Sequence, residues 1–151
     1  MAKYVVSNEF KKLNIGLALD EGLATPDDVI PVYYGERNVF WVKFHCHGNP
    51  GHGSRFIKDT AAEKVQYLTN KLLGYREEQR KKFEADPNND LGDFTTINLT
   101  YMEGGFANQP NVVPNKFIVG FDMRICPTTT ISKFEEQLNK WCEEVIQLHR
   151  V

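Results

Sequence analysis

The sequence VFWVKFHCHGNPGHGSR, residues 39–55, runs from an alternating apolar segment into a loop rich in glycine. Successive side chains of a strand point to opposite faces, so the alternation predicts a strand with one apolar face. That face carries Phe40, Val42, Phe44 and Cys46, and the opposite face carries Trp41, Lys43, His45 and His47. A glycine-rich corner between a strand and a helix that exposes polar side chains is a common location for a functional site.

The residues after this corner predict two helices and two more strands. An amphipathic helix begins after Thr60, which can cap it, and its apolar stripe is Ala61, Val65, Leu68, Leu72 and Tyr75. A second strand spans residues 94–102, with one face formed by Ile97, Leu99 and Tyr101. A third strand presents Phe117, Val119, Phe121 and Met123, and its other face carries Gly120, Asp122 and Arg124. The last helix opens at the capping-box pattern SKFE, which starts at Ser132, and its apolar stripe is Phe134, Leu138, Trp141, Val145 and Leu148.

The order strand, helix, strand, strand, helix predicts an α+β fold. It matches a ferredoxin-like two-layer sandwich, an antiparallel sheet with two helices on one face, that lacks its last strand. Before it, Ile15–Leu19 and Val29–Tyr34 read as two short strands, which cannot form a core of their own. We therefore expect residues 1–37 to be a partial segment that packs on something outside the chain, and residues 38–151 to be a separate domain.

The composition is that of an ordinary soluble domain. Of the 151 residues, 41% are hydrophobic and 25% are charged, and the net charge of -2 gives no field that favours nucleic acid or anionic membranes. No apolar run approaches the roughly 20 residues of a membrane helix. Cys46, Cys126 and Cys142 are widely spaced, which predicts free thiols in a reducing compartment. We expect a cytoplasmic protein without nucleic-acid or membrane partners.

The histidines and the cysteine of the opening stretch superficially resemble a zinc cluster. His45 and His47 share one strand face, but Cys46 points to the opposite face. A structural zinc site usually needs four ligands, and no second cluster in the chain supplies them. The alternation therefore favours two surface histidines over a zinc site that they form with a third residue.

Four further residues are candidates for a site, and each also has an ordinary interpretation. His52 lies between two glycines, where the backbone can approach a ligand, although an exposed loop histidine is commonly incidental. Arg124 and Asp122 can form a surface salt bridge. Alternatively, the guanidinium of Arg124 can bind a ligand carboxylate through two parallel hydrogen bonds. Asn111 suits a turn beside proline. Glu21 lies at the end of an apolar run, where its carboxylate can be a metal ligand or part of a turn.

Several motifs, taken together, are similar to those of a known family. They are LDEG at residues 19–22, YGER at 34–37, GNPGHGSRF at 48–56, DTAAEK at 59–64, EGG at 103–105, NVVP at 111–114, FDMR at 121–124 and FEEQL at 134–138. Over nearly its whole length the chain resembles the zinc-dependent aminoacylase and carboxypeptidase family, whose members have a two-metal site.

The resemblance implies both an architecture and a reaction. Such enzymes hydrolyse N-acyl-L-amino acids at a catalytic domain that holds two zinc ions, and they form homodimers through an inserted lid domain of ferredoxin-like form. Residues 1–37 would then be a piece of the catalytic domain, and residues 38–151 would be the lid.

The resemblance also implies roles for single residues. Glu21 matches a carboxylate that ligates one zinc ion. His52 matches the lid histidine that stabilises the oxyanion in the partner subunit's active site. Asn111 and Arg124 match lid residues that hold the substrate, with Arg124 on its free carboxylate.

Two departures from the family pattern limit what the chain can do. Residues 106–110 separate EGG from NVVP, so Asn108 is an alternative to Asn111, which we prefer because its spacing to Arg124 is kept. The remaining zinc ligands and the general base of the family have no counterpart here. We therefore expect the isolated chain to bind no zinc and to be inactive. The alternative function is that of a non-catalytic dimerisation or interaction module.

Overall fold

The computed structural model describes residues 2–18, 26, 28, 30, 32–33 and 35–148, and the chain divides into two compact units, residues 1–34 and 35–151. The first unit contains two short helices, α1 (Ala2–Val5) and α2 (Asn8–Lys12). Ser7 caps α2, because its hydroxyl accepts the backbone N–H of Phe10 at 3.1 Å.

The two strands predicted in this first unit are wrong for the residues that the structure describes. Residues 15–18 belong to no strand, and Leu17 is 78% exposed. In the second predicted run, Ile30, Val32 and Tyr33 are also exposed and outside any strand. A short apolar run needs a neighbouring strand for its backbone groups, and the described part of this unit contains none. Leu19 lies outside the described residues.

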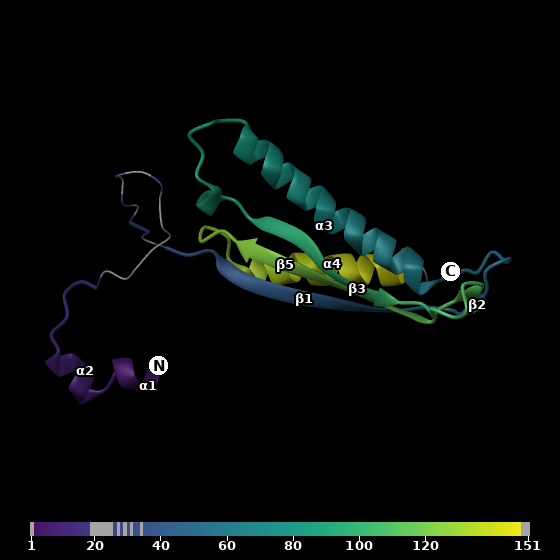
Figure 1. Cartoon of the computed structure of the whole chain (residues 1–151), viewed down its shortest axis with the longest axis horizontal. Helices are drawn as coiled ribbons and strands as arrows, with labels where there is room; N and C mark the ends of the chain where they lie inside the picture. The colour runs from purple at the N-terminus through teal and green to yellow at the C-terminus, as the bar shows by residue number, and fades with distance from the viewer. Residues whose placement is uncertain are drawn as a thin grey trace. The chain divides into compact units, whose positions relative to one another are not determined.

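The second unit is an antiparallel sheet whose one face is covered by two helices (Figure 1). Its long elements are β1 (Asn38–His47), α3 (Ala61–Glu84), β3 (Thr96–Gly104), β5 (Lys116–Ile125) and α4 (Ile131–Leu148). Its short elements are β2 (Gly51–His52), the 3-10 helix η1 (Leu91–Asp93) and β4 (Val112–Val113). The order of the three long strands is β1-β5-β3, which confirms the predicted ferredoxin-like arrangement.

The strand order shows where this fold is open. β1 and β3 both pair antiparallel with β5, so they run parallel to each other with β5 between them. Repeating this split βαβ pattern from β5 through α4 would place a further strand against the outer edge of β1. Among the described residues no strand follows α4, and β1 has a single hydrogen-bonded neighbour in its sheet.

The hydrophobic core lies between the sheet and the two helices. The predicted apolar faces of β1 and β5 point into it, and the rings of Phe44 and Phe121 meet edge to face with centroids 6.1 Å apart. The helices add Leu68 and Leu72 from α3, and Phe134, Leu138, Trp141 and Val145 from α4. These helical positions recur at three- and four-residue steps, so each helix buries one stripe as predicted, except that Leu148 at the end of α4 is exposed.

A β-bulge makes the prediction for one side chain of β3 wrong. Leu99 pairs with Phe121, but Tyr101 pairs with Gly120, so the register shifts between Leu99 and Tyr101. The extra residue turns Tyr101 to the face away from the helices, where the Nζ of Lys43 lies 4.3 Å from the centre of its ring. Tyr101 therefore does not share a face with Leu99, as strict alternation predicts.

The beginning of α3 agrees with the sequence prediction, and the beginning of α4 does not. Thr60 forms a capping box with Glu63, whose carboxylate accepts the Thr60 N–H at 2.7 Å while the Thr60 hydroxyl accepts the Glu63 N–H at 3.2 Å. α4 begins at Ile131, so Ser132 already lies inside the helix and cannot be its capping residue.

Candidate functional site

Arg124 lies near the end of β5, on the sheet face that the helices leave open. Its Nε and Nη2 donate to the two carboxylate oxygens of Asp122 at 2.8 and 2.9 Å. Trp41, directly opposite Asp122 on β1, donates its indole Nε1–H to the same carboxylate at 2.9 Å. Two neighbouring strands thus place three donors around one carboxylate. We call Trp41, Asp122 and Arg124 the sheet cluster.

The sheet cluster is a charge-assisted network at the protein surface. The side chains of Arg124 and Asp122 are 40% and 26% exposed. The hydrogen bonds from Arg124, and then the one from Trp41, hold the pKa of Asp122 below its ordinary value. Asp122 occupies the Nε/Nη2 edge of the guanidinium, whereas Nη1 has no protein partner among the described residues. The Nη1/Nη2 edge can therefore still take a second carboxylate.

A second arginine ties the outer strands together at this end of the sheet. The Nη1 of Arg37 donates to Thr96 Oγ1 at 3.1 Å and to the carbonyl of Phe94 at 3.4 Å. Thr96 is paired with Arg124 in the sheet, so the guanidinium groups of Arg37 and Arg124 lie at the same end of the sheet. The sequence analysis missed the roles of Arg37 and Trp41. The available signals were the alternation, which places Trp41 on the open face, and the YGER motif, which contains Arg37.

The second group of predicted residues lies in loops beyond the other end of β1. His52 pairs with Val112 in the small β2–β4 sheet, and the Gly53 N–H donates to the carbonyl of Asn111 at 2.7 Å. This pairing brings the side-chain Nδ2 of Asn111 to 3.3 Å from His52 Nε2. On the other side of the ring, Ser54 Oγ lies 2.8 Å from Nδ1. We call His52, Ser54 and Asn111 the loop cluster.

The contacts of the loop cluster bear on the tautomer of His52. The backbone N–H of Ser54 donates to Nδ1 at 3.3 Å, which favours Nε2 as the nitrogen that carries the proton of the neutral ring. The contacts of Nδ1 with Ser54 Oγ and of Nε2 with Asn111 Nδ2 take their donor and acceptor roles from the tautomer, so they do not fix it themselves.

The two clusters lie at opposite ends of β1, and Figure 1 shows β2, which contains His52, beyond one end of the long strands. Arg124 pairs with Val39 near the beginning of β1, whereas the loop cluster follows His47 at its end. At about 3.3 Å per residue, the stretch from Val39 to His47 extends over roughly 26 Å. One small substrate therefore cannot contact Arg124 and His52 of the same chain.

The remaining sequence candidates are metal ligands. Glu21 lies outside the described residues. His45 and His47 are exposed and Cys46 is buried, in agreement with the predicted split between the two faces. Within the described part of the chain, no three or more His, Cys, Asp or Glu side chains are grouped so that they could hold a metal ion. None of the described helices is long and apolar enough to cross a membrane.

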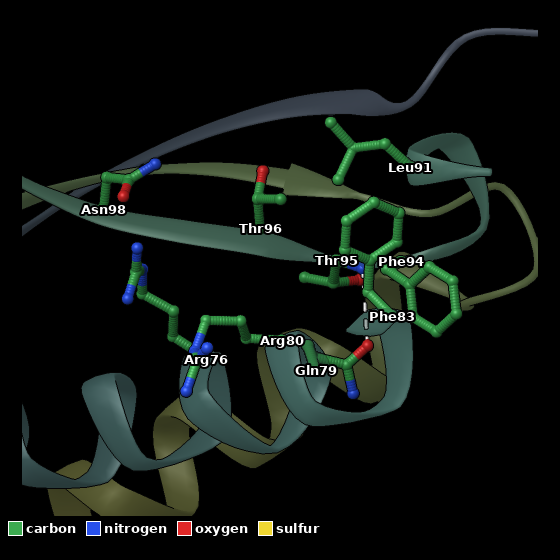
Figure 2. Close-up of a pocket in the computed structure, with 9 residues that line it drawn as sticks. All are labelled: Arg76, Gln79, Arg80, Phe83, Leu91, Phe94, Thr95, Thr96 and Asn98. Carbon is green, nitrogen blue, oxygen red and sulfur yellow. Dashed lines mark hydrogen bonds between the residues drawn. The ribbon is translucent and has the colours of Figure 1, made fainter. Parts of the chain in front are cut away.

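A cavity of about 120 Å³ opens between the C-terminal half of α3 and the beginning of β3 (Figure 2). In its wall, the backbone N–H of Thr95 donates to Gln79 Oε1 at 3.4 Å, and the rings of Phe83 and Phe94 meet edge to face. None of the side chains of the sheet cluster or the loop cluster lines this cavity. It is therefore not part of either candidate site.

A larger groove of about 430 Å³ follows β1 between α3 and α4. It is lined in part by Cys46 and Cys142, and burial raises the pKa of both thiols. Together with Cys126, these cysteines are all free, which confirms the prediction of unpaired thiols. The groove lies where the split βαβ pattern leaves room for a further strand.

A profile of the peptidase dimerisation domain matches residues 34–148. The chain belongs to the peptidase dimerisation domain family. The matched residues include every member of the sheet cluster and of the loop cluster, so both candidate sites lie inside this dimerisation domain.

Curated relatives of this dimerisation domain are named aminoacylases. Aminoacylase-1A of Rattus norvegicus is 45% identical over 144 residues, which cover 95% of this chain and 35% of the relative. Aminoacylase-1 of Homo sapiens is 43% identical over 143 residues, again 95% and 35% of the two chains. The predicted resemblance is confirmed, and this chain spans about a third of the length of these relatives.

Solved structures share the fold of the dimerisation domain at low sequence identity. An amidase of the hydantoinase/carbamoylase family from Burkholderia multivorans superposes with a TM-score of 0.56 at 12% identity, over 74% of this chain and 25% of that chain. An M20 family metallo-carboxypeptidase from Sulfolobus solfataricus superposes with a TM-score of 0.51 at 15% identity, over 74% and 41%. At these identities the similarity establishes the fold alone.

Proposed function

We propose that this chain is the lid and dimerisation segment of a cytoplasmic zinc aminoacylase, which hydrolyses N-acyl-L-amino acids to a carboxylate and a free amino acid. The names of the relatives in rat and human support this reaction. Residues 1–37 would belong to the catalytic domain and residues 38–151 to the lid. The observation that carries the proposal is the separation of the two clusters, because it calls for two chains at each active site.

Arg124 is proposed to bind the free carboxylate of the substrate. Its guanidinium is held on a strand of the sheet, and its Nη1/Nη2 edge remains open for two parallel hydrogen bonds. A carboxylate common to all N-acyl amino acids suits a fixed fork, because the fork selects the amino-acid end and leaves the side chain to other contacts.

His52 and Asn111 are proposed to act together in the partner subunit's active site. Their side chains are 3.3 Å apart, and Nε2–H of His52 is a donor that can stabilise the oxyanion of a tetrahedral intermediate. Asn108 makes no comparable contact with His52 among the described residues, which supports the choice of Asn111. Because Arg124 lies at the far end of the sheet, the loop cluster of one chain and the sheet cluster of the other would share a substrate.

Zinc enters the proposal through the family alone. Glu21 is the ligand that the resemblance assigns, and it lies outside the described residues. The described residues form no metal site, so we derive no step through the metal. A two-metal centre in the complete enzyme would supply an activated water, and without it we expect the isolated chain to be inactive.

A second candidate function is a non-catalytic interaction module that pairs with itself or with a full-length subunit. It is favoured by the second unit, whose helices and sheet share one buried core without a metal site in the described residues. Light scattering tests this function on the chain as it stands. A strict monomer that does not bind a full-length aminoacylase would contradict it.

Exchange of subunits between two defective enzymes tests the proposed aminoacylase function. Residues 35–148 replace the matching segment of mouse Aminoacylase-1, which is 45% identical to this chain. One graft carries His52→Ala and the other carries Arg124→Ala, and each alone should be nearly inactive. In the mixed dimer, the Arg124 of one chain meets the His52 of the other, so one of its two sites is intact.

The mixture should recover up to about a quarter of the activity of the unmutated graft, because random pairing gives half mixed dimers with one intact site each. The control mixes two His52→Ala preparations that carry different affinity tags. Mixed dimers that form, as shown by the tags, and yet remain inactive would contradict the sharing of sites between chains.

A further inference from the structure

We propose that Asp122 and Trp41 are positioning residues, which hold the Arg124 guanidinium so that its Nη1/Nη2 edge faces the carboxylate of the N-acyl amino acid. This inference rests on the proposed function of Arg124. It adds two residues, one of them on a different strand, to which neither the motifs nor the relatives assign a role.

The geometry of the carboxylate distinguishes this arrangement from an ordinary surface ion pair. Asp122 Oδ1 accepts from Arg124 Nε, and Oδ2 accepts both from Arg124 Nη2 and from Trp41 Nε1, all at 2.8–2.9 Å. An isolated pair on one strand could turn as a unit about its side-chain torsions. The bond from Trp41 on β1 anchors the carboxylate from a second strand and so restricts the plane of the fork.

Register supplies the reason why Trp41 reaches this carboxylate. Trp41 and Asp122 are directly opposite each other in the β1–β5 ladder, and both point to the open face. Side chains opposite each other in an antiparallel pair are about 5 Å apart at Cβ, which suits an indole N–H and a short carboxylate. A shift of β1 by one residue would send Trp41 to the core face while Asp122 stayed on the open face, so the contact depends on the register of the sheet.

The exposure of Trp41 is consistent with a positioning role. The side chain is 75% exposed, so it contributes little to the core, yet its one polar atom is hydrogen-bonded. Fixing a long arginine side chain in advance reduces the conformational entropy that is lost when a ligand binds. Asp122 and Trp41 thus act on substrate affinity through Arg124, without touching the substrate.

Nuclear magnetic resonance on this chain tests the positioning directly. The Nε–H of Arg124 and the indole N–H of Trp41 give separate signals, and Asp122→Asn should shift both, because an amide cannot accept from all three donors. Trp41→Phe keeps the ring but removes the indole donor, and it should shift and broaden the Arg124 signal. Glu103→Gln is the control. It changes a carboxylate on β3 that accepts a hydrogen bond from Tyr101, and it should leave both signals in place.

Steady-state kinetics of the mouse graft test the consequence for the reaction. Asp122→Asn should raise KM about tenfold, and Trp41→Phe about fivefold, with kcat within a factor of about two, since affinity is lost before the chemical step. Glu103→Gln should change neither constant. A purely structural role would instead lower the melting temperature at unchanged KM, so thermal unfolding of each variant is measured in parallel.

Arg124→Lys separates failure of this inference from failure of the proposed function. If Arg124→Lys leaves KM unchanged, Arg124 does not bind the substrate and the proposed function of this residue is wrong. If Arg124→Lys raises KM strongly while Asp122→Asn and Trp41→Phe leave it unchanged, only the positioning inference is overturned. Unshifted Arg124 and Trp41 signals in folded Asp122→Asn protein would overturn it as well.

Discussion

The sheet cluster and the loop cluster are both small networks of polar side chains, but the chain supports them in different ways. Asp122 and Arg124 lie on the ten-residue strand β5, and Trp41 lies on the ten-residue strand β1. His52 and Asn111 instead lie at or beside paired strands of two residues each. The first network takes its geometry from a long register. The second must take it from local bonds such as Gly53 N–H to the Asn111 carbonyl.

The difference shows which structural change each network can tolerate. A long ladder keeps side chains in place as long as the core beneath it is packed. A loop depends on close backbone contacts with its neighbours, here with the beginning of α3, where Asn49 N–H donates to the Asp59 carbonyl at 2.9 Å. Substitutions should therefore separate the two networks by the kind of change that damages them.

Phe121→Ala should have the largest effect, because it removes a ring that is 2% exposed directly beneath the sheet cluster. We expect the free energy of unfolding to fall by about 3–5 kcal/mol through the cavity that is left. Phe56→Ala is the matched control, since Phe56 is fully exposed in the loop, and it should change stability by less than about 0.5 kcal/mol. Urea denaturation measures both, and equal losses would contradict the different support of the two networks.

Gly48→Ala should damage the loop end and spare the sheet. A Cβ at Gly48 would overlap backbone atoms of Asp59, Thr60 and Ala61, so the corner before His52 would have to move. We expect a loss of about 1–3 kcal/mol, with shifted amide signals around His52 and unshifted Trp41 and Arg124 side-chain signals.

The control for this substitution is Gly74→Ala. Gly74 lies inside α3 with open space around it, so alanine there should stabilise the protein by about 0.5–1 kcal/mol. If Gly48→Ala is as harmless as Gly74→Ala, the loop is not held by the close approach that the structure describes.

Thr60→Ala should have a smaller effect on the same end of the molecule. It removes the hydroxyl that accepts the Glu63 N–H, so one half of the capping box of α3 is lost. The expected cost is about 1 kcal/mol, read from thermal unfolding. Thr60→Ser retains the hydroxyl and should restore most of this loss; if serine is no better than alanine, the cap does not contribute.

Lowering the pH should weaken the ion pair between Asp122 and Arg124, and this should change the stability less than any of the substitutions above. The pKa of Asp122 is lower in the folded state, so its pairing stabilises the protein above the unfolded-state pKa of about 4 and this contribution is lost as pH falls through the folded-state value. Asp122→Asn should lower the free energy of unfolding at neutral pH but not in strong acid. The pair is partly exposed, so the difference is small.

Denaturation of the unmutated chain and of Asp122→Asn at both pH values measures this difference. Asp93→Asn changes a carboxylate outside the sheet cluster and serves as the control. The same gap between Asp122→Asn and the unmutated chain at both pH values would show that Asp122 does not stabilise the fold through its charge.

Most of the second unit could be predicted from the sequence, because its strands and helices bury one face each. Alternation identified the buried side chains of β1 and β5, and the helical stripes identified those of α3 and α4. It failed at Tyr101, because a bulge adds one residue without a signal in the pattern. The apolar run at residues 15–18 also predicted a strand that the structure does not contain, because such a run forms a strand only where a partner strand exists.

For the candidate sites too, the sequence predicted contacts within one strand but not contacts between segments distant in the chain. Asp122 and Arg124 were predicted to share a face, and they do. Their link to Trp41 depends on how β1 is aligned with β5, and alignment of strands distant in sequence cannot be read from either strand alone. The approach of Asn111 to His52 depends on loop pairing across 59 residues, for which the family motifs supplied the only indication.

The outer edge of β1 has a consequence for handling this chain in solution. Within the described part of the chain, this strand of ten residues has a neighbouring strand on one side only, so its other edge presents backbone N–H and C=O groups that no strand pairs. Such an edge is a template for adding strands from other molecules, and Val39 and Trp41 leave apolar surface beside it. Concentrated preparations of this chain should therefore form soluble aggregates rich in β-structure, and Val39→Lys should delay them.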